Sequence, residues 1–434
     1  MTGKLLRGRI LSFSRRPQGP GDAGAYVYLE DGGVLIGEQG RIARVADFSE
    51  FTGADVAVID HRPHLITAGF IDPHIHFVQM QVVGSYAGSL LEWLNTYTFI
   101  EEQRFADPAH AARIASLFFD ELIRHGTTSA AAYCSVHAAS AEAFFAEAEK
   151  RNMAMFAGKS MMDRNCPDAL RDTPRRGYDE TKALIEKWHG RGRAQVAITP
   201  RFAVTSSHAQ MEAIAALARE FPEVPIQTHL SENHDEIAFV GELFPEHEDY
   251  TSVYSHYGLL RPKALFGHAI HLSAWEKAMM AETGAVAVSC PTSNLFLGSG
   301  LYDLFAADRA GMRSALATDI GGGTSYSMLQ TLDAFYKVQQ MCQNRLDPLT
   351  ALYLITRGNA EAMGLADRVG SVAPGKYADL VVLDAAATPA MRVKMERISS
   401  LAEEAFLLQT LGDDRAVAET YVAGQPVKSK LAAH

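Results

Sequence analysis

Two histidines separated by one residue, His74 and His76, occur in the run IDPHIHF. If this run is a strand, alternate side chains point to the same face, so both imidazoles are directed at one place. An isolated His-x-His pair is a weak sign of a metal site, because a chain with 16 histidines contains such pairs by chance. Its weight therefore depends on whether other metal-binding side chains are brought to the same place.

Four further polar residues lie at the ends of other strand-like runs. His229 and Glu232 end the run PIQTHLSE, His268 lies in ALFGHAIHL, and Asp319 lies in SALATDIG. Imidazole nitrogens and carboxylate oxygens suit zinc or a similar divalent ion, and a catalytic ion keeps one position open for water. The predicted metal ligands are His74, His76, His229 and Asp319.

The number of ions is suggested by the fourth strand-like run, QVAITPRFA. Many barrel hydrolases hold two metals bridged by a modified lysine at the end of the fourth strand, whereas Arg201 stands near the end of this run. We therefore predict one ion per chain, zinc with iron(II) as the alternative. His268 is then free to hydrogen-bond the metal-bound water; in the alternative, His271 does so and His268 fills the core.

The elements that must position these residues alternate along the middle of the chain. Eight short apolar or β-branched runs are separated by longer helical patterns, which is typical of parallel β/α units. Eight such units close into a barrel whose strand ends all open on one mouth, where barrel enzymes place their catalysis. We therefore predict an α/β fold, a (β/α)8 TIM-like barrel over residues 68–367. The runs span residues 69–77, 127–134, 153–163, 195–203, 225–232, 264–272, 285–294 and 314–321.

The two ends of the chain differ from its middle. Residues 1–67 and 368–434 contain short strand-like runs with turns and little helical pattern, and both segments are rich in Val, Ile and Leu. We predict that they form together a small composite β domain, a β-sandwich. The alternative is a pair of unrelated frayed extensions.

Composition excludes several classes of function. The formal net charge of -11 opposes binding to a phosphate backbone, so nucleic acid is not an expected partner. The sequence lacks an apolar run long enough for a membrane span and a signal peptide at its start, so we expect no membrane association and a mature protein of full length. The four cysteines form no CxxC pair, which opposes a disulfide framework and a thiolate zinc site. A cytoplasmic protein is expected, with a homodimer as the default assembly.

Two weaker features flank the predicted site. The glycines of GGGTS at 321–325 follow a strand but lack the lysine of a phosphate-binding loop, so we expect them to give the backbone room beside the metal. Trp93 and Tyr97 are spaced i and i+4 in LLEWLNTYTF. Core packing is the expectation for this pair, and a lid over the substrate is the alternative.

Several longer motifs resemble those of the guanine deaminases, a family of the amidohydrolase superfamily. The resemblance covers about residues 66–340. His-x-His and the aspartate of the eighth run are shared by the whole superfamily, whereas the blocks LLEWLNTYTF, MMDRN, TPRF and SNLFLGSG are far more specific. The motifs are AGFIDPHIHFVQ, LLEWLNTYTF, GKSMMDRN, TPRFAVTSS, QTHLSEN, CPTSNLFLGSG and TDIGGGTSYSMLQT.

The resemblance implies a hydrolase that converts guanine to xanthine and ammonia. A zinc-bound hydroxide would attack the carbon bearing the exocyclic amine, with Asp319 accepting its proton and Glu232 carrying protons to the ring nitrogen and the leaving amine. Gln79, Arg201 and Phe202 are implied to shape the pocket for this small-molecule purine. Arg201 offers donors only, which matches the 6-oxo acceptor of guanine and not the 6-amino group of adenine. A structural salt bridge to an acidic neighbour is the alternative role for Arg201.

Two other functions remain open at this point. The first is a deaminase on the same scaffold that acts on another oxopurine, a pterin or a triazine. The second is a metal-free structural relative that serves as an assembly protein, although the presence of every expected ligand argues against it. The fold alone supports neither alternative.

Overall fold

The computed structural model describes residues 3–51, 56–86 and 90–431. Each of the eight strand-like runs contains part of a parallel barrel strand, and the fourth run is divided into two short strands that both pair with β7. The strands are β5 (Phe70–His76), β6 (Thr127–Cys134), β7 (Ala154–Met161), β8 (Gln195–Val196), β9 (Thr199–Pro200), β10 (Ile226–Leu230), β11 (Ala264–His268), β12 (Val286–Ser289) and β13 (Arg313–Leu316).

Backbone hydrogen bonds close these strands into a barrel. Strands β5 to β9 form one set of neighbours and β10 to β13 form another. The amide of Gln227 donates to the carbonyl oxygen of Ile198 (3.0 Å) and joins the two sets on one side. On the other side the amide of Asp319 donates to the carbonyl oxygen of His74 (2.9 Å). The fold is therefore the TIM barrel expected from the alternation of strands and helices.

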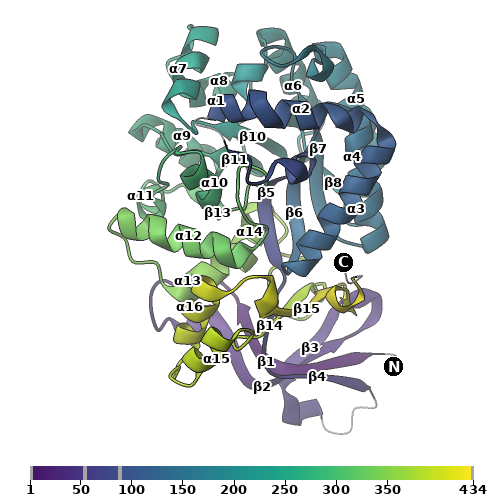
Figure 1. Ribbon diagram of the computed structural model, residues 1–434, viewed down its shortest axis with the longest axis vertical. Helices are drawn as coiled ribbons and strands as arrows, with labels where there is room; N and C mark the ends of the chain where they lie inside the picture. The colour runs from purple at the N-terminus through teal and green to yellow at the C-terminus, as the bar shows by residue number, and fades with distance from the viewer. Residues whose placement is uncertain (1–2, 52–55, 87–89, 432–434) are drawn as a thin grey trace.

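Helices cover the outside of the barrel, as Figure 1 shows. Many begin at a residue whose side chain caps the first turn: Asn233 accepts from the amide of Glu236, and Ser273 accepts from that of Glu276. These helices are α3 (Pro108–Arg124), α4 (Ala138–Arg151), α5 (Pro174–Trp188), α6 (His208–Glu220), α7 (His234–Leu243), α8 (Tyr250–His256), α9 (Ala274–Thr283), α10 (Pro291–Phe296), α11 (Leu304–Arg309), α12 (Met328–Met341), α13 (Pro348–Tyr353) and α14 (Asn359–Ala362).

A helical stretch after the first barrel strand lies near the mouth of the barrel (Figure 1). Helix α1 (Leu90–Trp93) continues through a π-helical turn over residues 94–98 into α2 (Phe99–Glu102). Single π turns inside helices are frequent at functional sites. This stretch contains the whole LLEWLNTYTF motif.

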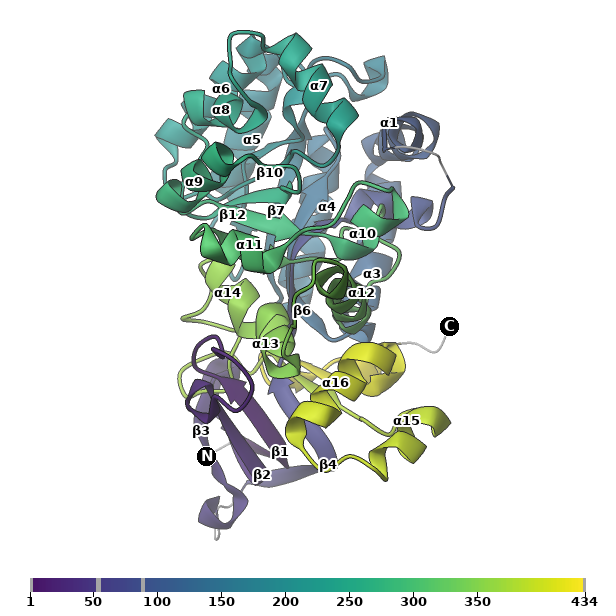
Figure 2. The same cartoon turned by 90° about the vertical axis from the view of Figure 1, so that its left-hand side faces the viewer.

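Strands from both ends of the chain form one seven-stranded sheet, in the order β16-β15-β14-β4-β1-β2-β3. Strand β4 pairs in parallel with β1 and antiparallel with β14, and so joins the two ends. Figures 1 and 2 show the purple N-terminal strands beside the yellow C-terminal segment, below the barrel. The strands are β1 (Lys4–Phe13), β2 (Tyr26–Ile36), β3 (Ile42–Asp47), β4 (Ala57–Ala68), β14 (Leu380–Leu383), β15 (Val417–Val422) and β16 (Gln425–Pro426).

The packing of this sheet as a sandwich and the domain boundaries stay predictions. Residues 1–2, 52–55 and 432–434 of the predicted β domain lie outside the described residues.

The expectation of little helical pattern after residue 368 was wrong. Helices α15 (Pro389–Met395) and α16 (Leu401–Leu411) lie between β14 and β15. The side chain of Ser400 caps α16, and Ala405 and Leu408 are buried on one face of it. This face packs towards α12 and α13 of the barrel. The helical spacing of these apolar residues is present in the sequence, and the strand-rich surroundings masked it.

Among the described residues, no helix has both the length and the apolar character that crossing a membrane requires.

Candidate metal centre and substrate pocket

The four predicted metal ligands lie together at the mouth of the barrel. His74 and His76 are at the end of β5, His229 is in β10, and Asp319 follows β13. The Nε2 atoms of His76 and His229 are 3.3 Å apart. Oδ1 of Asp319 is 3.4 Å from Nε2 of His74 and 3.4 Å from Nε2 of His76. These nitrogen and oxygen atoms therefore converge on one point.

The geometry of this cluster fits a bound divalent ion. Two ligands of a tetrahedral ion at the usual metal–ligand distances are about 3.4 Å apart, which matches the separations seen here. Both ring nitrogens of His74 are buried and, within the described parts of the chain, have no hydrogen-bond partner. Buried polar atoms are rarely left unpaired, so these nitrogens indicate that an ion belongs at this point.

The protonation states of these side chains also suit a cation. Burial lowers the pKa of His76 to about 4. Burial, and then the neighbouring imidazoles, hold the pKa of His229 well below its ordinary value. Burial alone would raise the pKa of Asp319, but the imidazoles of His74 and His76, each 3.4 Å from its carboxylate, keep that pKa well below its usual range. Neutral imidazoles and an ionised carboxylate are the forms that bind metal.

Hydrogen bonds behind two imidazoles fix which nitrogen faces the centre. Nδ1 of His229 donates to the carbonyl oxygen of Arg201 (2.6 Å), so its Nε2 presents a lone pair to the cluster. Nδ1 of His268 donates to Oδ1 of Asn294 (2.8 Å), so its Nε2 also faces the site. Both rings are therefore held in the tautomer that a metal ligand or a water-binding group needs.

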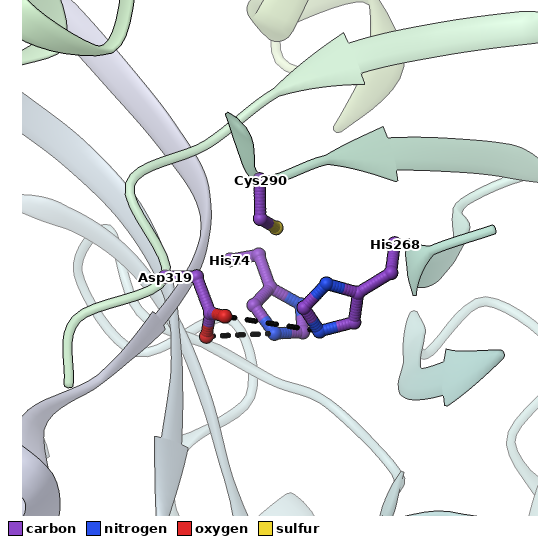
Figure 3. Close-up of side chains that lie close together, drawn as sticks. All are labelled: His74, His268, Cys290 and Asp319. Atoms are coloured by element: carbon purple, nitrogen blue, oxygen red, sulfur yellow. Dashed lines mark ion pairs between the residues drawn. The ribbon is translucent and has the colours of Figure 1, made fainter. Parts of the chain in front are cut away.

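A cysteine that no sequence motif links to the site lies beside this cluster. Ligand atoms of His74, His268, Cys290 and Asp319 lie within 4.8 Å of one another. Figure 3 shows the Asp319 carboxylate directed at the imidazoles of His74 and His268, with the Cys290 thiol above the rings in this view. Burial raises the pKa of this thiol well above its ordinary value, which favours the protonated form over the thiolate that binds metals.

Close backbone approaches and unusual backbone angles surround the cluster. A Cβ atom on Gly267 would lie 2.4 Å from Cε1 of His74, and one on Gly323 would lie 1.8 Å from the carbonyl oxygen of Thr318. Gly323 thus gives the backbone the room expected of the GGGTS glycines. Asp319 adopts a φ of 54°, a left-handed conformation that is uncommon outside glycine and is concentrated at functional sites.

Glu232 lies next to the cluster with one oxygen directed at His268. Its Oε2 is 3.4 Å from Nε2 of His268, and its Oε1 accepts a hydrogen bond from the hydroxyl of Ser299 (2.8 Å). Burial, and then the charge of Asp319, raise the pKa of Glu232 to about 8. A carboxyl group with such a pKa exchanges protons readily near neutral pH, as general acid/base catalysis requires.

The structure separates the two histidines that the sequence left open. Nε2 of His268 is 3.7 Å from Oδ2 of Asp319. Nε2 of His271 instead donates to the carbonyl oxygen of Ser299 (2.8 Å), and its ring lies against that of His234. The geometry therefore places His268, and not His271, beside the predicted metal ligands.

A cavity opens beside the cluster, and the predicted substrate contacts line it. Gln79, Arg201 and Phe202 line it, together with metal-cluster residues and Glu232. Apolar lining comes from α1 and the start of the π-helical turn, through Leu90, Trp93 and Leu94. Trp93 is buried, as core packing predicts, and it also lines this cavity.

Arg201 also makes the salt bridge that was its alternative role. Its Nη1 lies 2.9 Å from Oε1 and 2.7 Å from Oε2 of Glu102, and both side chains are buried. Arg201 therefore lines the cavity and pairs with an acid at the same time. Glu102 could not be identified from the sequence, because two acidic residues at the end of a helix carry no sign of which one points inward.

Comparison with known proteins places the chain in a family. Residues 65–427 match the family model described as the Amidohydrolase family. The match covers most of the chain, including every predicted site residue. The chain therefore belongs to the amidohydrolase family.

Similar proteins narrow this class. The guanine deaminase of Escherichia coli (strain K12) is 43% identical over 430 residues, which is 98% of each chain. The solved structure of E. coli guanine deaminase superposes with a TM-score of 0.94 at 42% identity, over 98% of this chain and 99% of that one. Guanine deaminase from C. acetobutylicum, solved with guanine bound in the active site, has a TM-score of 0.88 at 28% identity, over 98% and 100% of the two chains. Within the amidohydrolases, the chain belongs to the guanine deaminases, which confirms the resemblance seen in the sequence.

Proposed function

We propose that this protein catalyses the hydrolysis of guanine to xanthine and ammonia. The main support is the placement of a predicted metal centre and Glu232 beside a cavity lined by Gln79 and Arg201. The relative from C. acetobutylicum holds guanine in its active site and matches this chain over 98% of its length. The preference for guanine over a pterin or a triazine is supported by the similarity to guanine deaminases over the whole chain.

We propose that His74, His76, His229 and Asp319 hold one zinc ion per chain, with iron(II) as the alternative. When bound, such an ion lowers the pKa of a water ligand towards about 7 and so supplies a nucleophile at neutral pH. Asp319 accepts a proton from the water. Nε2 of His268, fixed by Asn294 behind it, orients that water by a hydrogen bond.

The purine is bound by side chains on the other side of the cavity. Donors of Arg201 face the 6-oxo group, and the carboxamide of Gln79 contacts the ring edge. Phe202 supplies an apolar surface for the flat ring. Leu90 and Trp93 close the remaining wall and exclude bulk water, which strengthens the polar contacts inside the pocket.

Glu232 carries the protons that the reaction moves. A carbon–oxygen bond forms between water and the carbon that bears the amine, and the carbon–nitrogen bond then breaks. Glu232, protonated at the start, gives its proton to the unprotonated ring nitrogen beside this carbon. It then takes up the second proton of the attacking water and passes it to the amine, which leaves as ammonia. The proton held by Asp319 returns to Glu232 before the next turnover. The raised pKa of this buried carboxyl group lets it both hold and release a proton near neutral pH.

A substrate panel tests this function. The metal-loaded protein is incubated separately with guanine, adenine, cytosine, a pterin and an aminotriazine, and each ultraviolet spectrum is followed. We expect rapid change with guanine alone. Faster turnover of the pterin or the triazine would reassign the substrate, and a folded protein that binds no ion and turns over none of them would be a structural relative.

Three further features belong to this proposal. Residues 1–67 and 368–434 form one β domain packed as a sandwich beside the barrel of residues 68–367, supported by the shared sheet of both ends. The protein acts as a homodimer in the cytoplasm, without nucleic acid or membrane partners. The net charge of -11 supports the absence of a nucleic-acid partner.

A further inference from the structure

We propose that Glu102 keeps the purine pocket electrically neutral and positions both polar purine contacts, Gln79 and Arg201. In this role Glu102 selects a neutral base as substrate and weakens retention of the more acidic product. The inference rests on the proposed deamination of guanine, since it concerns how one pocket binds the substrate guanine and the product xanthine.

One buried carboxylate touches both predicted substrate contacts. Glu102, the last residue of α2, is 0% exposed. Its Oε1 accepts hydrogen bonds from Nε2 of Gln79 (2.9 Å) and from Nη1 of Arg201 (2.9 Å). Its Oε2 accepts a second contact from the same Nη1 at 2.7 Å. Gln79 and Arg201 are 122 positions apart in sequence and are held in one arrangement by this side chain.

The contact with Glu102 determines which way the Gln79 carboxamide points. Its nitrogen donates to Glu102, while its Oε1 accepts from the amide of Gly321 (3.2 Å). The reversed orientation would set two acceptors against each other at Glu102 and two donors at Gly321. One N–H of Gln79 is therefore left, in a known direction, for a ligand.

Arg201 is held from three sides. Its guanidinium carbon lies 5.3 Å from the centre of the Phe99 ring, one turn of helix before Glu102. Its backbone oxygen accepts from Nδ1 of His229. In the described parts of the chain, the hydrogen bonds of the guanidinium itself run from Nη1 to Glu102, so its remaining donors stay available to a ligand.

The charge of Arg201 explains why an acid is needed at this place. A buried cation without a partner is unfavourable, and guanine, a neutral base, brings no charge to pair with it. Glu102 supplies the missing negative charge from within the protein. Xanthine carries a second oxo group in place of the amine and is a stronger N–H acid than guanine. An unpaired Arg201 would therefore hold the xanthine anion, whereas the pair of Arg201 with Glu102 does not.

The test replaces Glu102 by its uncharged isostere. Glu102→Gln keeps the shape of the side chain and removes its charge. Only one of its two terminal atoms, the oxygen, can accept hydrogen bonds from Gln79 and Arg201. We expect the KM for guanine to rise by at least about 10-fold, as when one partner of a buried charge pair is removed. Xanthine should inhibit this variant more strongly than it inhibits the parent, so the ratio of its inhibition constant to the KM for guanine should fall. This fall should become larger as the pH is raised and xanthine ionises. Metal content should stay unchanged.

Glu101→Gln is the matched control. Glu101 precedes Glu102 in the same helix turn but pairs with Arg104 (2.8 Å) and His110 (3.3 Å), away from the cavity contacts. This variant should leave the KM for guanine and the inhibition by xanthine within about twofold of the parent, as expected for a pair outside the pocket.

A second variant separates charge from position. Glu102→Asp keeps the charge but is one methylene shorter, so it should raise the KM for guanine. The ratio of the xanthine inhibition constant to this KM should stay close to that of the parent. It also supplies the test if Glu102→Gln does not fold. An unchanged KM for guanine in folded Glu102→Gln or Glu102→Asp would overturn the inference. The same ratio of xanthine inhibition constant to KM in both variants would overturn it as well. If the parent itself does not deaminate guanine, the proposed function fails instead.

Discussion

The hydroxyl of Ser299 donates a hydrogen bond of 2.8 Å to Oε1 of Glu232. The backbone amide of Ser299 donates to the backbone carbonyl oxygen of Asn294 (2.8 Å). The side chain of the same Asn294 accepts from Nδ1 of His268. The segment after β12 thus holds both the predicted proton carrier and the histidine beside the water. The specific SNLFLGSG motif runs through this segment, which gives its sequence a physical role.

Loss of the Ser299 hydroxyl should lower turnover without removing the ion. Ser299→Ala removes the hydrogen bond that holds one oxygen of Glu232. Removal of such an outer hydrogen-bond partner typically lowers activity about 10- to 100-fold, so we expect kcat to fall about 10-fold. Steady-state kinetics and metal analysis measure the two quantities. Ser255→Ala, at an exposed position in α8, is the control. Equal kcat values for the two variants would show that Ser299 has no positioning role.

Glu232→Gln should keep the fold and the ion while lowering turnover of guanine by about 100-fold or more, because proton transfer by a placed side chain contributes about 10²–10⁴. The amide fills the same space but cannot carry the protons. Glu242→Gln, at an exposed position in α7, should behave as the parent. Near-normal turnover by Glu232→Gln would show that Glu232 is not the proton carrier and only fills space in the site.

His229→Ala should lose both the ion and the activity, because it removes one of four converging ligands. Elemental analysis of the parent should give about one divalent ion per chain, as four ligands without a bridging lysine predict. His208→Ala, which alters a surface histidine paired with Glu246, should keep ion and activity. Two ions per fully active parent chain would falsify the single-ion site.

Arg201 should determine the choice between guanine and adenine. The parent should prefer guanine over adenine by a factor on the order of 10⁴, because the 6-amino group of adenine would set a donor against the donors of a buried arginine. Arg201→Ala should reduce guanine turnover far more than it reduces metal content or the melting temperature. The control is Arg219→Ala, at an exposed position in α6. Comparable parent rates on the two purines would contradict this assignment.

The barrel and the cluster of ligands could be predicted because both depend on local patterns. Strand-like runs that alternate with helical patterns predict the barrel, and a barrel places all strand ends on one mouth. His74 and His229 could therefore be grouped although they are 155 positions apart. Family membership bears out this line of reasoning for the fold and the activity class, and the roles of the individual residues stay predictions.

The second layer of the site could not be predicted in the same way. Glu102 and Asn294 act through the direction of a side chain, and that direction is set by tertiary packing of short helices whose sequences carry no periodic signal. Cys290 is a lone cysteine at a strand end, and without a partner at metal-ligand spacing it gave no reason to place it beside His74. Helix α16 was missed for a different reason, since its apolar spacing is present but lies among strands.

The most direct test of the central claim is the amount of xanthine and ammonia that the protein forms from guanine. The same preparation is assayed as loaded with metal, after removal of the metal by a chelator, and after addition of zinc. We expect one xanthine and one ammonia per guanine consumed, loss of both products on chelation, and their return with zinc. A folded, metal-loaded protein that leaves guanine unchanged, or that consumes it without releasing ammonia, would contradict the account.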